Sequence, residues 1–225
     1  MVDAYTSAGR KPVDLIAVFT GFAAGLLHVF VGVDHLAALA PIAVKDPSRA
    51  TLTGAKWGFG HGLGVLIIGG LGLAFRNVID IDAASAWAEF AVGFMLIAIG
   101  IWAIVKSRRV EVHQHSHDHN EKAHEHLHAH PSGDATHRHA ALGVGLLHGM
   151  AGSGHLFGVL PALALPTNEA VFYLLAYLVA AVGGMAGFGF FIGRISQSGG
   201  PERVTRLMFG SGVVAIVVGV TWLFL

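Results

Sequence analysis

The chain contains Gly25-Leu-Leu-His-Val-Phe-Val-Gly-Val-Asp-His-Leu-Ala-Ala-Leu-Ala-Pro41 and, 120 positions later, Gly145-Leu-Leu-His-Gly-Met-Ala-Gly-Ser-Gly-His-Leu-Phe-Gly-Val-Leu-Pro161. Eight of the seventeen positions are identical, and they include two histidines and the closing proline. Apolar residues match often by chance in a hydrophobic chain, whereas two histidine pairs and a proline in one register do not. The match predicts a duplicated unit that places imidazole side chains inside apolar segments.

The composition indicates a membrane protein. Of the 225 residues, 54% are hydrophobic and 12% are charged, whereas a soluble domain usually has about 25% charged residues. Six apolar segments are long enough to cross a hydrocarbon core of about 30 Å. They cover residues 13–44, 51–75, 84–105, 140–165, 169–195 and 204–225. We therefore expect an all-α polytopic membrane protein with about six transmembrane helices.

A weaker match extends the repeat to the last span of each half. At an offset of 119 residues, four positions agree: Phe90, Gly93, Ile97 and Gly100 with Phe209, Gly212, Ile216 and Gly219. An odd number of spans per unit makes the second unit enter from the opposite side, which predicts a 3+3 inverted repeat. Many transporters place a substrate site between such repeats; a structural duplication without transport is the alternative. The expected organisation is a polar tail (1–12), a first repeat (13–106), a loop (107–139) and a second repeat (140–225).

The first apolar segment is too long for one straight span. Its 32 residues would reach about 48 Å as a continuous helix. We expect the helix to break or bend near Gly32–His35 and to continue as a shorter piece to Pro41. The equivalent stretch after Ala140 carries the same glycine and proline and should behave in the same way.

The basic residues predict the orientation. With six spans, one side of the membrane would hold three cations and the other eleven, and the positive-inside rule places the larger group in the cytoplasm. The three are Arg10, Lys11 and Arg76; the eleven are Lys45, Arg49, Lys56, Lys106, Arg108, Arg109, Lys122, Arg138, Arg194, Arg203 and Arg206. Both termini are then outside, and the membrane is a bacterial inner membrane or its organellar equivalent. We expect the first span itself to direct insertion, with no cleavable signal peptide.

The loop predicted to be cytoplasmic is rich in histidine and has no apolar periodicity, so we expect it to be disordered without ligand. Its ten histidines are His113, His115, His117, His119, His124, His126, His128, His130, His137 and His139. Their close spacing predicts many weak chelating sets that buffer or funnel divalent cations, with a metallochaperone as a further partner. A solvated linker is the alternative.

A shaped metal site is predicted within the spans. Ionisable groups at bilayer depth are costly and usually mark an ion or substrate path, and neutral imidazole and carboxylate suit divalent nickel, cobalt, zinc or iron. The candidate ligands are His28, Asp34, His35 and His61, with His148 and His155 completing the site or guarding its far side. Interhelical hydrogen bonding is the alternative role for any one of these histidines.

Helix geometry restricts this site. His28 and His35 would lie about 10.5 Å apart along a straight helix, too far to share an ion with metal–nitrogen bonds of about 2 Å. Either the helix breaks at Gly32, or the two histidines serve different points along a path. Asp34 and His35 would diverge on a regular helix, and unwound backbone could let both point inward. The second copy has Gly154 at the position of Asp34, so the acid belongs to the first repeat.

Several function classes are excluded. The chain has no cysteine, which removes thiolate metal sites and thiol redox chemistry. Its formal net charge is zero, so we expect no nucleic-acid partner. The spans lack a His-Glu-x-x-His motif, and five scattered intramembrane histidines are too few for a di-iron membrane enzyme. We therefore expect neither an enzyme nor a bound prosthetic group.

The string His28-Val-Phe-Val-Gly-Val-Asp34-His35 resembles the His-x5-Asp-His signature of the nickel/cobalt permease superfamily. The continuation to Pro41, Trp57-Gly-Phe-Gly-His61 and Leu147-His148-Gly-Met-Ala-Gly-Ser-Gly-His155 look most like its NicO-type, UreH-like branch, with HupE/UreJ proteins more distant. The resemblance implies a nickel or cobalt carrier in which His28, Asp34 and His35 are essential.

We thus expect a permease that moves Ni²⁺ or Co²⁺ by alternating access at an intramembrane His/Asp site. The best-known importers of the superfamily have two more spans, and a long histidine-rich loop is common in its exporters, so import and export both stay open. The alternative function is a membrane metal donor, sensor or accessory protein for nickel insertion into a urease or hydrogenase.

Overall fold

The computed structural model of the protein describes residues 15–74, 81–108, 140–151, 160–162 and 164–224. Over these residues every regular element is a helix, as the sequence predicts. The elements are α1 (Leu15–Val31), α2 (Val33–Lys45), the 3-10 helix η1 (Pro47–Arg49), α3 (Ala50–Ala74), α4 (Ile81–Ser107), α5 (Ala140–Met150), α7 (Thr167–Gln197) and α8 (Gly200–Phe224). The predicted N-terminal tail and almost all of the histidine-rich loop lie outside the described residues.

Three helical segments of the described chain are long and apolar enough to cross a membrane. They are Glu89–Ser107 within α4, Thr167–Gln197 and Gly200–Phe224. The pair α1 and α2, which meet at 70°, makes a fourth if it is one broken span. The count of six spans therefore stays a prediction.

The outer surface of the bundle is apolar. Phe19, Val31 and Phe191 are among many large hydrophobic side chains that are more than half exposed. Apolar surface of this extent is rare on soluble monomers and is what a lipid environment requires. Together with the long apolar helices, it identifies an integral membrane protein that lies in a lipid bilayer.

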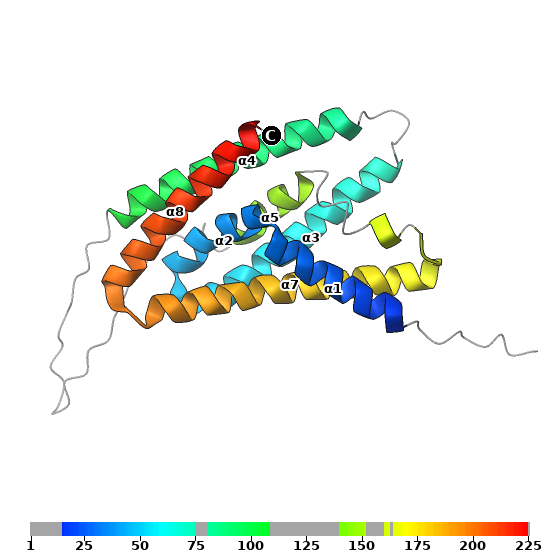
Figure 1. Cartoon of the computed structure of the whole chain (residues 1–225), viewed down its shortest axis with the longest axis horizontal. Helices are drawn as coiled ribbons and strands as arrows, with labels where there is room; N and C mark the ends of the chain where they lie inside the picture. The colour runs from blue at the N-terminus through cyan, green and yellow to red at the C-terminus, as the bar shows by residue number, and fades with distance from the viewer. Residues whose placement is uncertain (1–14, 75–80, 109–139, 152–159, 163, 225) are drawn as a thin grey trace, which may run out of the picture.

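Each of the main helix pairs joins a helix from the first half of the chain with a helix from the second half. The most extensive contacts join α4 with α8, α3 with α5, α1 with α7 and α3 with α7. Figure 1 shows α4 and α8 side by side along one edge of the molecule, and α7 along the opposite edge with α1 crossing it. The shorter helices α2 and α5 lie between these edges. Helices from both halves of the sequence therefore surround the interior.

Small residues allow the helices to approach closely, as is usual in membrane bundles. A Cβ atom on Gly93 would lie 2.9 Å from the carbonyl oxygen of Gly219, and one on Gly219 would lie 2.7 Å from that of Gly93. The same reciprocal relationship joins Gly100 and Gly212. At these crossings the backbones of α4 and α8 touch directly.

The predicted break in the first long segment occurs at Gly32, where α1 ends and α2 begins. A side chain could not fit there, because a Cβ atom would lie 2.5 Å from Nδ1 of His35 and 3.0 Å from the carbonyl oxygen of His28. The expected end of the second piece at Pro41 is wrong: α2 includes this buried proline and continues to Lys45. The proline lacks one backbone donor, and this loss does not end the helix.

The second copy of the motif begins in the same way. Helix α5 ends at Met150, and the backbone N–H of Ala151 donates to the carbonyl of His148. The expected break therefore begins near Met150, and the rest of it falls on residues 152–159, outside the described residues.

Candidate metal centre

Five of the predicted site residues come together in the interior of the bundle. His28 lies near the end of α1, Asp34 and His35 in the first turn of α2, His61 in α3, and His148 near the end of α5. His28 is half-buried, Asp34 is 6% exposed, and each of the other three is at most 2% exposed. Residues from four helices thus form one buried polar cluster.

The bend at Gly32 brings the first two histidines together. Nε2 of His28 lies 3.0 Å from Nε2 of His35, whereas a straight helix would separate the two residues by about 10.5 Å. Of the two possibilities left open by the sequence, the broken helix is therefore correct. Unwound backbone at Asp34 and His35 is not what brings the two residues to the cluster, because both belong to the regular helix α2.

Backbone contact between α5 and α3 places His148 beside the cluster. A Cβ atom on Gly145 would collide with the carbonyl oxygen of Trp57, and one on Gly149 would collide with that of His61. Because neither glycine carries a side chain, α5 approaches α3 closely enough for His148 to reach Asp34. The two glycines are therefore part of how the sequence builds the site.

The cluster has two parts that share His35. In the first part, nitrogen atoms of His28, His35 and His61 lie within 4.8 Å of one another. In the second, Nδ1–H of His35 donates to Oδ1 of Asp34 at 2.9 Å, and Nε2–H of His148 donates to Oδ2 at 3.0 Å. Each part contains three groups close enough to hold a metal ion.

The contacts in the three-histidine part cannot all be ordinary two-centre hydrogen bonds. Nε2 of His28 lies 3.0 Å from Nε2 of His61 and 3.0 Å from Nε2 of His35. A ring nitrogen carries either one hydrogen or one lone pair, so the two contacts would have to share it. Protonation of His28 does not change this, because the imidazolium ring still carries only one hydrogen on Nε2. A cation at the point of convergence would accept a lone pair from each ring.

Two aromatic residues flank the cluster. The ring of Trp57 stacks on His61 with centroids 5.2 Å apart and planes 10° apart, and Tyr177 of α7 lies 5.7 Å from His28. Nε1 of Trp57 and the hydroxyl of Tyr177 are buried without a hydrogen-bond partner in the described part of the chain. Neither residue belongs to the set of ligands predicted from the sequence. The repeat offset of 120 residues relates position 57 to position 177 and could have found the pair.

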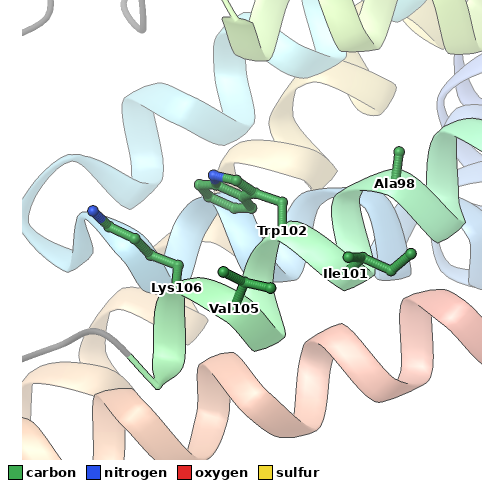
Figure 2. A pocket seen from close by; sticks show the side chains of 5 residues that line it. All are labelled: Ala98, Ile101, Trp102, Val105 and Lys106. Carbon is green, nitrogen blue, oxygen red and sulfur yellow. The ribbon is translucent and has the colours of Figure 1, made fainter.

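The bundle has a small cavity between α3 and α7 and a larger groove along α4. A small apolar cavity of about 170 Å³ between α3 and α7 is lined by Gly62, Tyr177 and Ala181 among others, next to the cluster. A larger groove of about 580 Å³ runs along α4, where Trp102 and Lys106 extend to the same side (Figure 2). The candidate ligands lie on other helices, so this groove is separate from the candidate site.

The remaining predicted ligands cannot be placed. His155 and all ten histidines of the loop, which run from His113 to His139, fall on residues outside those described. Their roles stay predictions.

A family model described as the cytochrome c biogenesis protein transmembrane region matches residues 61–221, most of the chain. The chain belongs to the family of the cytochrome c biogenesis protein transmembrane region. The match begins at His61 and ends within α8, so it includes His148 and leaves out the first motif. The histidine motifs do not predict this membership.

Three known proteins match the chain over 80% to 91% of its length. Chloroplast protein FOR GROWTH AND FERTILITY 2 of Arabidopsis thaliana is 34% identical over 91% of this chain and 55% of its own length. Its namesake FOR GROWTH AND FERTILITY 1 is 32% identical over 91% of this chain and 58% of its own. The chain thus spans little more than half of these two relatives.

The third relative is the urease accessory protein UreH of Bacillus sp. (strain TB-90). It is 30% identical over 80% of this chain and 78% of its own length. The relationship to UreH-like proteins that the histidine motifs predict is therefore confirmed. No solved structure matches the chain.

Proposed function

We propose that the protein carries a divalent transition-metal ion across the membrane, Ni²⁺ in the first place and Co²⁺ in the second. The observation that carries this proposal is the convergence of three imidazole Nε2 atoms in the bundle interior, where their contacts cannot all be ordinary two-centre hydrogen bonds. Imidazole nitrogen is a ligand suited to nickel, and ionisable groups at membrane depth usually mark an ion path. The relationship to UreH supports the same function.

We further propose that two inverted repeats of three spans move about this site. The contact of Gly25 with the carbonyl of Tyr177 has its counterpart, 120 residues along, in the contact of Gly145 with the carbonyl of Trp57. A two-fold axis between related halves produces such exchanged pairs. The reciprocal glycine contacts of α4 and α8 fit the same relation, and many transporters alternate access by rocking such halves.

Thiol chemistry plays no part in this function. The 225 residues contain no cysteine, so this member of its family cannot relay electrons through thiols. The names of the relatives state no catalysed reaction either. Metal movement without covalent chemistry fits the residues that are present.

The direct test is nickel flux in cells that express Asp34→Asn or His35→Ala at the level of the parent. Both variants should lose most uptake or efflux, because one alters the buried acid and the other removes a converging nitrogen. Glu202→Gln is the control, since Glu202 is exposed and pairs with Arg206 on the surface. Parental flux in both site variants would refute the proposed site.

A second candidate function is metal delivery to a nickel enzyme, and it rests on the accessory role named for UreH. In that case the histidine-rich loop would pass the ion to a partner such as a metallochaperone. Deleting residues 112–139 discriminates between the two. Lost urease or hydrogenase activation with intact flux supports delivery, whereas normal activation by the deletion, combined with lost flux after His28→Ala, supports transport.

A further inference from the structure

Asp34 has both of its carboxylate oxygens engaged by histidine. Oδ1 accepts from Nδ1–H of His35 at 2.9 Å, and Oδ2 accepts from Nε2–H of His148 at 3.0 Å. The carboxylate is 6% exposed and His148 is fully buried. A buried carboxylate needs such donors, because its desolvation is costly unless it is paired and hydrogen-bonded.

These two hydrogen bonds determine which nitrogens carry a lone pair that could bind a cation. Because Nδ1 of His35 carries the hydrogen, Nε2 of neutral His35 carries a lone pair, and Nε2 is the atom that faces His28. Nε2–H of His148 donates to Asp34, so this nitrogen has no lone pair that could bind a metal. A carboxylate that orients a ligating histidine through its other nitrogen is a common arrangement around metals.

The alternative is an ion bound directly by Asp34, His35 and His148, which also lie close enough together. In that group, however, both short contacts are normal donor–acceptor pairs, and an ion would have to displace two hydrogens. The group of His28, His35 and His61 has the opposite property, because the single hydrogen or lone pair on Nε2 of His28 would have to be shared between two nitrogen–nitrogen contacts of 3.0 Å.

We infer that Asp34 and His148 are positioning residues, and that the ion is held by the Nε2 atoms of His28, His35 and His61. This inference rests on the proposed metal-binding function. His148 of the second histidine motif then contributes support rather than a ligand: His148 holds Asp34, Asp34 holds His35, and His35 presents Nε2 to the ion. The contact between Asp34 and His148 joins residues 114 positions apart.

The test is nickel X-ray absorption on the purified full-length chain loaded with one equivalent of Ni²⁺. All ten loop histidines are replaced by serine to remove their background. The parent should show three imidazole ligands and no carboxylate from Asp34. His61→Ala should lose one imidazole. His148→Ala should keep all three and bind nickel about 10- to 100-fold more weakly, as expected for loss of a residue that supports a ligand.

A conservative variant separates positioning from general structure. Glutamine can place an amide N–H near the position of histidine Nε2, so His148→Gln should recover most of the affinity lost in His148→Ala. Glu202→Gln should bind like the parent. Loss of an imidazole in His148→Ala, or a metal–oxygen ligand that disappears in Asp34→Asn, would overturn the assigned roles while leaving metal binding intact. A parent that neither binds nor carries nickel would overturn the proposed function as well.

Discussion

Nε2 of His28 and Nε2 of His35 lie 3.0 Å apart although the two residues belong to helices that meet at 70°. The relationship depends on Gly32, which separates the helices and sits against the ring of His35. A glycine is required at this position because a side chain would not fit. The backbone conformation does not require it, since the φ of −71° is accessible to any residue. The break in the helix is thus part of the metal site.

Gly32→Ala should therefore weaken nickel binding at least tenfold without unfolding the protein. The new Cβ atom would lie 2.5 Å from Nδ1 of His35, so the ring must turn away from His28 and Asp34. Isothermal titration with Ni²⁺ on the chain without loop histidines measures the effect. Gly183→Ala is the control, because a Cβ atom there meets nothing within 4 Å. Equal affinities for the two variants would contradict this account.

Gly145→Ala should destabilise the bundle by about 1–3 kcal/mol, the usual cost of overpacking. Its Cβ atom would collide with the carbonyl oxygen of Trp57, which is backbone and cannot turn aside. Gly143→Ala lies on the same helix and meets nothing within 4 Å, so it should be neutral or stabilise by about 0.5–1 kcal/mol through helix propensity. Thermal unfolding in detergent compares the two, and a lower midpoint for Gly143→Ala would contradict the packing.

Nickel affinity should fall as the pH falls from 7.5 to 5.5. Imidazole binds a metal only in its neutral form, so protons compete with the ion for each of the three histidines. The sign is the same for every ligand, and the decrease should be steeper than for a single histidine. Titrations at several pH values, again without the loop histidines, provide the measurement. An affinity that stays constant or rises on acidification would exclude a site made of histidines.

The predicted orientation can be tested with single cysteines, because the chain has no cysteine of its own. Asn168, next to the start of α7, should face the outside, and Ser198, directly after α7, should face the cytoplasm. In intact bacteria a membrane-impermeant maleimide should label Asn168→Cys and leave Ser198→Cys unlabelled until the cells are permeabilised. The reverse pattern would place the loop and both termini on the other sides.

The sequence predicted the members of the cluster better than their roles. Histidine and aspartate are rare in apolar spans, so His28, Asp34, His35, His61 and His148 could be selected from residue type and repetition alone. Their close approach needed the bend at Gly32, which the sequence offered as one of two possibilities. That these residues bind a metal stays a prediction.

The sequence could not assign individual atoms. Asp34 is predicted to be a ligand, and its oxygens face His35 and His148, so it could bind the ion directly or orient His35. This difference depends on side-chain directions over about 3 Å, and residue spacing does not encode them. The end of α2 could not be predicted from the sequence for a related reason. Pro41 predicts an end, but packing of α2 against α3, α7 and α8 lets the helix continue to Lys45.

The crossed pairing of the helices has a consequence for the history of the chain. α1 packs mainly on α7, α3 on α5 and α7, and α4 on α8, so half of the molecule alone would leave its main contact faces bare. The proposed duplication therefore implies an ancestor that worked as an antiparallel homodimer. Fusion of two such copies would let them diverge, which fits an acid at Asp34 in one copy and Gly154 in the other.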